Sequence, residues 1–187
     1  MSRLKTFAAV VLAATLPAMA QAADFNLTGG SVLGDTTATA TFSSGGIGLN
    51  ITANSGGSAL DVVLLSNGVG VKASALDVFP GIGNNEFLTL TFSQAVNLTS
   101  LRLAEWDSPD DAILSWAGGS RTLVGDGIVS TDTENLSGVV GQVFTLTGTS
   151  ALTTFRLNGL TAVAAVPEPS TYALMGLGLV GIGFAAR

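Results

Sequence analysis

The segment FLTLTF, residues 87–92, carries its apolar side chains, Phe87, Leu88, Leu90 and Phe92, at a spacing close to two residues. Successive side chains of a β-strand point to opposite faces, so this spacing predicts a strand with one buried face. Similar short runs, rich in β-branched and aromatic residues, occur at residues 36–42 (TTATATF), 98–103 (LTSLRL), 143–147 (VFTLT) and 154–160 (TFRLNGL). The sequence therefore predicts a protein built mainly of strands.

Turn sequences separate these runs, among them Ser44-Gly45-Gly46, Asn67-Gly68 and Gly125-Asp126-Gly127. No segment between them shows a convincing helical period, and no regular repeat is visible. Many short strands with frequent turns are typical of antiparallel sandwiches. We expect residues 23–163 to form one antiparallel β-sandwich domain, jelly-roll-like in topology. Its predicted large core residues are Phe87, Phe92, Phe144, Phe155 and Trp116.

The N-terminal residues have the order of a secretory signal. Arg3 and Lys5 give a basic start, residues 6–16 carry no charge, and small residues follow. Both Ala18-Met19-Ala20 and Ala20-Gln21-Ala22 fit the small-x-small rule for signal-peptidase cleavage. The alternative, a buried N-terminal helix, does not account for this order. We expect a signal helix at residues 1–22 and an exported protein.

Two missing residue types exclude several functions. The chain has no cysteine, so it has neither a disulfide nor a thiolate nucleophile, and no histidine, so no imidazole can act as base or metal ligand. Ser-His-Asp and Cys-His catalysis are therefore excluded. Without Arg3 and Lys5, five basic residues face thirteen acidic ones, a net charge of −8. Such a balance repels phosphates, so nucleic acid is not an expected partner.

The last residues combine a proline-rich corner with an apolar tail. Residues 172–186 carry no charge, Tyr172 suits the headgroup level, and Arg187 suits the cytoplasmic side. The tail is somewhat shorter than the roughly 20 residues of an ordinary span, so we expect a short transmembrane helix within residues 164–187. The alternative, a buried strand or helix, fits poorly with the glycines of the tail. Residues 176–181 match G-x-G-x-x-G, but prolines stand where the dinucleotide fingerprint needs a strand.

This tail resembles the PEP-CTERM sorting signal. The resemblance rests on Val166-Pro167-Glu168-Pro169-Ser170-Thr171, the aromatic Tyr172, the glycine-rich apolar stretch and the terminal Arg187, about the last 22 residues. It implies export by a Gram-negative bacterium that makes extracellular polysaccharide. It also implies transient retention in the inner membrane and processing by an exosortase, which recognises Pro167, Glu168 and Pro169. Physically, a Pro-Glu-Pro corner joins neither a helix nor a sheet, and so it presents an extended peptide.

An acidic segment is the one candidate binding site in the predicted sandwich. Glu105, Asp107, Asp110 and Asp111 lie within seven residues, next to a proline, and are expected in a loop. Oxygen ligands in a loop suit Ca²⁺, with oxygens of Asn84, Asn85 and Glu86 as further candidates. The alternative is a solvated acidic turn. A glycosidase would need a second acid across a cleft.

The neighbouring Trp106 leaves two interpretations open. Its ring is either a core residue at a strand end or a platform on which a sugar ring stacks. Taken together, the sequence predicts a secreted, non-enzymatic surface or matrix protein, with an exosortase and possible exopolysaccharide as partners. The alternative is a carbohydrate- or calcium-binding adhesion module. No other cofactor is expected.

Overall fold

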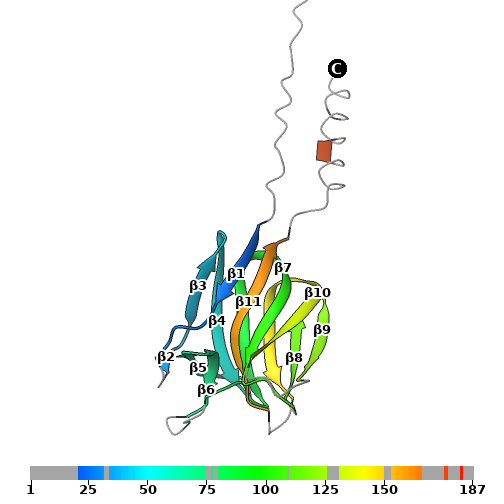
Figure 1. Ribbon diagram of the computed structural model, residues 1–187. Coiled ribbons are helices and arrows are strands. Elements are labelled where there is room, and N and C mark those ends of the chain that lie inside the picture. Colours follow the sequence, from blue (N-terminus) through cyan, green and yellow to red (C-terminus); the bar gives the residue numbers. More distant parts are fainter. Residues whose placement is uncertain are drawn as a thin grey trace, which may run out of the picture.

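The computed structural model describes residues 21–31, 34–74, 77, 80–108, 110–125, 131–149, 153–165, 175–176 and 182. Between residues 21 and 165 the described part of the chain is all-β, as the sequence predicts (Figure 1). Its strands are β1 (Ala22–Asn26), β2 (Asp35–Thr37), β3 (Ala40–Ser44), β4 (Ile47–Ser55), β5 (Ser58–Leu65), β6 (Gly68–Lys72), β7 (Glu86–Ala104), β8 (Asp111–Trp116), β9 (Gly119–Val124), β10 (Thr131–Gly148) and β11 (Arg156–Ala164).

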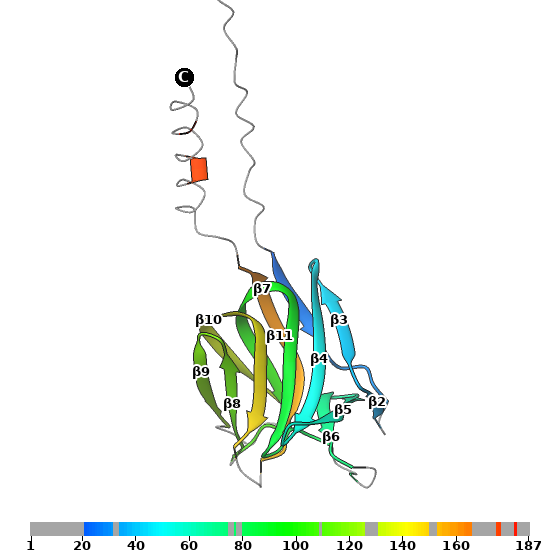
Figure 2. The same cartoon turned by 180° about the vertical axis from the view of Figure 1, so that it is seen from behind.

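Two long strands, β7 and β10, organise the structure. The first half of β7 pairs with β4 and with the end of β10, and its second half pairs with β11 and with the start of β10. Between the halves, Ser93, Gln94 and Ala95 are exposed, and the register of β10 shifts between Gly141 and Val143. Both strands therefore arch over one end of the molecule, as Figures 1 and 2 show.

The arch produces a barrel-like sandwich. Starting from β7, pairings run through β4, β5, β6 and β11 and return to β7, and every pairing between named strands is antiparallel. The sheet continues from β7 through β10 and β8 to β9. At its other end, β1 pairs with β11. Closing strands on one another covers edges that would otherwise present unpaired backbone groups.

The alternation in FLTLTF explains the position of the core. Leu88, Leu90 and Phe92 are buried, whereas Phe87 points to the opposite face and is half-buried. The Phe92 ring meets Phe25 at 5.9 Å and Phe144 at 5.7 Å, both edge to face. Of the predicted large core residues, Phe92, Phe144 and Phe155 are confirmed, while Phe87 and Trp116 are only partly buried. Each fully buried ring stabilises the fold by about 1.5–3 kcal/mol.

The run TTATATF does not form one strand. β2 ends at Thr37 and β3 begins at Ala40. The Thr37 hydroxyl donates to the Thr39 carbonyl at 3.0 Å and accepts the Thr39 N–H at 3.4 Å. Such local side-chain bonds compete with the sheet ladder, and here they break the strand.

The two expected terminal helices fall largely outside the described residues. Residues 1–20 of the signal segment are not described, and its Ala22 lies in β1 rather than in a helix. Likewise Ala164 is the last residue of β11. Beyond Ala165, only Met175, Gly176 and Ile182 are described, and all three are helical and exposed. Where the structure is described, it has no helix with the length and apolar character needed to cross a membrane.

Candidate functional site

The acidic loop lies between β7 and β8. It begins at Glu105, whose φ of 56° is left-handed and turns the chain away from β7. The Asp110 N–H donates to the Asp107 carbonyl at 2.6 Å, and the Asp107 N–H donates to Asp110 Oδ2 at 3.3 Å. The loop is therefore folded around one of its own carboxylates.

Asp110 is turned into the protein and is only 4% exposed. Its Oδ1 accepts the Thr154 N–H at 3.2 Å, which joins the loop to the segment before β11. Burial raises the pKa of Asp110, since it disfavours the charged carboxylate; the N–H groups of Asp107 and Thr154 lower that pKa in part, and the charges of Asp107 and Asp111 raise it further. Asp110 thus acts as a buried tie between two segments.

The end of β9 packs closely against the same loop. The Gly125 N–H donates to the Asp110 carbonyl at 2.7 Å. A Cβ at this position would lie 2.4 Å from the Asp107 carbonyl oxygen and 2.8 Å from that of Asp110. Gly125 is needed because the backbones approach so closely.

Glu105 has a different partner. Its Oε1 forms an ion pair with Arg156, whose side chain is 6% exposed, and accepts a hydrogen bond from Asn67 Nδ2 at 3.1 Å. Arg156 Nε also donates to the Pro80 carbonyl at 2.9 Å. A buried guanidinium needs such a counterion, so Glu105 neutralises Arg156.

These contacts bear on the predicted calcium site. Glu105 faces Arg156, the Asp110 carboxylate accepts two N–H groups, and Asp111 lies at the start of β8. In the described part of the chain, no group of three or more acidic side chains is placed to hold a metal ion. A site formed by Glu105, Asp107, Asp110 and Asp111 stays a prediction, and it would have to displace these contacts.

The neighbouring loop is likewise held by local contacts. Glu86 Oε2 accepts the Gly83 N–H at 2.8 Å, and Asn85 adopts a left-handed φ of 63°. Burial raises the pKa of Glu86, the Gly83 N–H lowers it in part, and the charge of Asp77 raises it further. Asn84 forms a bridge with Gly148. Among the described residues, Glu86 does not join the acidic loop in a group of three or more acidic side chains that could hold a metal ion.

Trp106 is a core residue. It is 1% exposed, and its ring meets Phe155 edge to face at 5.0 Å. Stacking a sugar ring on Trp106 is therefore wrong, because neither face of the indole reaches the surface. The sequence missed Arg156 as a buried charge, and no local signal marks it, since its partners come from distant loops.

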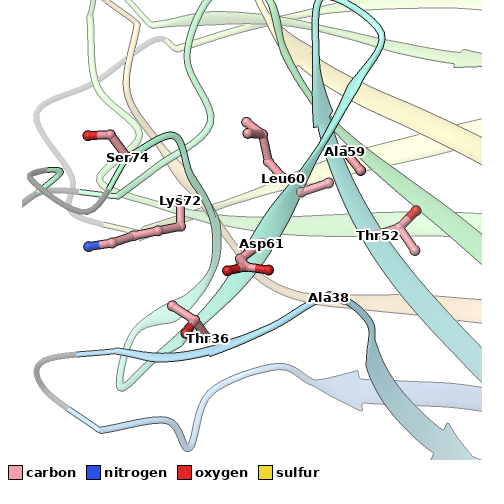
Figure 3. A pocket seen from close by; sticks show the side chains of 9 residues that line it. Thr36, Ala38, Thr52, Ala59, Leu60, Asp61, Lys72 and Ser74 are labelled. Atoms are coloured by element: carbon pink, nitrogen blue, oxygen red, sulfur yellow. The ribbon is translucent and has the colours of Figure 1, made fainter.

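Two of the surface hollows that the described residues form are lined by neighbouring strands. The larger, of about 550 Å³, lies among β2, β4, β5 and β6 and is lined by Thr36, Ala38, Thr52, Ala53, Ala59, Leu60, Asp61, Lys72 and Ser74 (Figure 3). The Lys72 ammonium points away from Asp61 and donates to the Asp77 carbonyl. The smaller, of about 400 Å³, is lined by Ser115, Trp116, Ala117, Gln142, Val143 and Thr145. None of the four predicted metal ligands lines either hollow.

The ends of the folded body lie side by side. Ala22 of β1 pairs with Val163 of β11, and Figure 1 shows both strand ends at the arched end of the sandwich. Just after β11, the Ala165 N–H donates to the Ala95 carbonyl at 2.9 Å. The chain therefore leaves the body at Ala165, directly beside the arch of β7.

Comparison with known families identifies the segment that follows. The PEP-CTERM protein-sorting motif matches residues 165–187. The match includes Pro167, Glu168 and Pro169, which lie outside the described residues. No curated protein matches the chain. The C-terminal region therefore carries a PEP-CTERM sorting signal, which implies an exported protein sorted by an exosortase.

Proposed function

We propose that this protein is a non-enzymatic component of the cell surface or extracellular matrix, released after an exosortase has processed its tail. The observation that carries the proposal is the sorting motif at residues 165–187, which begins where the sheet ends. In this proposal the signal segment is removed after Ala20, the earlier of the two small-x-small sites, since Ala22 already lies in β1. The tail that follows β11 holds the chain transiently in the inner membrane. Residues 23–163 are the jelly-roll-like body that is delivered.

We propose that the protein is not a catalyst because of the residue types that its sequence lacks. The sequence has no histidine and no cysteine, so the commonest bases and nucleophiles are missing. Asp110, the buried member of the acidic loop, and Glu105, the counterion of Arg156, are engaged in holding segments together. These roles support a scaffold, and exopolysaccharide is the proposed environment of the released body.

The proposal is tested by mass spectrometry of the protein secreted by a host that has an exosortase. We expect a mature protein that has lost the signal segment and whose C-terminus lies upstream of Tyr172. The Pro167→Ala/Pro169→Ala variant should keep its tail and stay with the membrane fraction. Secreted protein that still ends at Arg187 would contradict the proposal.

A further inference from the structure

The arched end of the body is free of charge. It consists of the start of β1, the β3–β4 turn, the middle of β7, the middle of β10 and the end of β11, which correspond to residues 21–23, 43–48, 91–99, 136–146 and 162–165. None of these residues is Asp, Glu, Lys or Arg, although the chain has thirteen acids. We call this set the exit face, because the chain leaves the body here.

Strand register joins the exit face into one surface. Ala22 pairs with Val163, Val163 with Asn97, and Asn97 with Val140, so a single row crosses β1, β11, β7 and β10. The row beyond it pairs Ala164 with Val96 and Val96 with Gly141. The charged side chains of these strands lie outside the face, and Asp24, Arg102 and Glu134 are the nearest to it along β1, β7 and β10.

Apolar side chains are exposed on this face. Val140 is 49% exposed and Val143 is 48% exposed, and both lie where β10 arches. The surrounding exposed residues Ser93, Gln94 and Ala95 are small or neutral. The opposite end carries the acidic loop with Glu105 and Asp107, both exposed. The exit face is therefore uncharged, whereas the acidic loop lies at the opposite end of the body.

We infer that the exit face rests on the surface of the phospholipid bilayer that holds the chain's own tail, until the tail is removed. This inference rests on the proposed function, because it needs the tail in a membrane. The Ala165 N–H is bonded to Ala95, and the match to the sorting motif starts at residue 165, so only residues 166–171 separate the face from the uncharged segment that begins at Tyr172. A short tether keeps the local concentration of the face at the bilayer high.

The charge distribution fixes the orientation of the body. Anionic headgroups repel acids within a Debye length, and the acidic loop lies at the end opposite the exit face. Asp24, which lies next to the face, is paired with Arg102. A neutral face with exposed valines can be buried at the interface without desolvating a charge. Membrane contact also explains why Val140 and Val143 are tolerated on the surface of a protein that is later secreted.

The test uses the full-length mature chain, with the signal segment removed and the tail intact, in nanodiscs of phosphatidylcholine and phosphatidylglycerol. The natural chain has no cysteine, so a single cysteine can carry an environment-sensitive dye without interference. A dye on Gln94→Cys reports the surroundings of the exit face. A dye on Asp107→Cys reports the surroundings of the acidic loop at the opposite end of the body. With a headgroup-attached quencher, we expect the Gln94 dye to be quenched at least about threefold more than the Asp107 dye, since quenching falls steeply with distance from the bilayer.

A matched pair of valine variants tests the face itself. Val140→Glu/Val143→Glu places charges on the exit face and should abolish the difference between the two dyes. Val124→Glu changes a valine that is 57% exposed at the end of β9, beside the acidic loop, and should leave it intact. Unchanged melting temperatures would show that both variants are folded.

Failure of the inference can be told apart from failure of the proposed function. If the full-length chain does not associate with nanodiscs at all, the tail is not a membrane segment and both ideas fall. If it associates but both dyes are quenched equally, the exit face is not oriented toward the bilayer and only the inference is overturned. Shielding of the Gln94 dye that depends on protein concentration and needs no lipid would assign the face to a second copy and would also overturn it.

Discussion

At the scale of single residues, the acidic loop shows that a buried carboxylate can hold two segments of a chain together by accepting hydrogen bonds from both. Asp110 is buried and accepts N–H groups from Asp107 and Thr154, which lie on different segments. An acceptor that satisfies buried donors stabilises the loop, but the charged form must lose its hydration. The raised pKa of Asp110 is the result of that competition.

This balance predicts a pH dependence of stability. The folded pKa of Asp110 lies above the ordinary value of 3.8, so the folded state binds this proton more tightly than the unfolded state. Its contribution is fully present below that ordinary value and is lost as the pH rises through the folded pKa. We expect wild type to lose stability relative to Asp110→Asn as the pH rises from about 4 toward neutrality.

Urea denaturation of both proteins over this pH range measures the effect. Glu86 shifts in the same direction in both proteins, so it cancels in the comparison. Asp61→Asn, at an exposed position of β5, is the control. A constant difference between wild type and Asp110→Asn at every pH would refute the prediction.

At the scale of elements, Arg156 joins the beginning of β11 to three loops. Its guanidinium contacts Glu105 after β7 and the Pro80 carbonyl before β7, and Glu105 in turn holds Asn67 in the β5–β6 turn. Glu105→Gln keeps the shape but removes the counterion. We expect a loss of about 1–3 kcal/mol in the free energy of unfolding, measured by chemical denaturation at neutral pH.

A second ion pair provides the control for this substitution. Arg102 and Asp24 lie 2.8 Å apart, with side chains 27% and 65% exposed. Exposed pairs are screened by water, so Asp24→Asn should cost less than about 1 kcal/mol. If Glu105→Gln costs no more than Asp24→Asn, the burial of Arg156 does not make it depend on Glu105.

The strands also show what a sequence pattern can and cannot predict. Alternation identified the buried face of residues 87–92 because it depends only on neighbouring side chains. It treated residues 87–92 and 98–103 as two strands, because the polar residues between them look like a turn; in fact they belong to the single strand β7. The arch depends on partners in β4, β10 and β11, which no local pattern contains.

The candidate site shows the same difference between what a local sequence pattern predicts and what distant partners determine. The sequence correctly placed Glu105, Asp107 and Asp110 in a loop after a strand. It did not predict which carboxylate turns inward, because that choice depends on the N–H of Thr154 and on the guanidinium of Arg156, both about fifty residues away along the chain. Spacing alone does not distinguish a metal site from a structural tie.

At the scale of the whole molecule, the join between body and tail should limit processing. Ala165 is bonded to Ala95, and Pro167 follows within two residues, at most about 7 Å of extended chain. An enzyme that binds Pro167, Glu168 and Pro169 therefore works against the folded body. We expect a flexible insert of about six Gly and Ser residues after Ala165 to speed removal of the tail severalfold.

Pulse-chase labelling of tailed and tailless protein in a host with an exosortase measures this rate. The same insert placed between Gly56 and Gly57, in an open turn where an added Cβ would meet nothing within 4 Å, is the control. Equal rates for wild type and the insert after Ala165 would show that the body does not obstruct the enzyme.

The pairing of β1 with β11 has a consequence for the timing of folding. β1 is among the first parts of the body to emerge during export and β11 the last, yet Ala22 must find Val163 and Asn26 must find Gly159. Contacts between such distant positions form slowly, because a long loop has to close first. The second half of β7 also pairs with β11. The edge of β7 that faces β11 therefore stays unpaired until residue 164 has crossed the membrane. In the proposed function, the pause of the tail in the bilayer would give the chain time to complete its sheet while it is held apart from other copies.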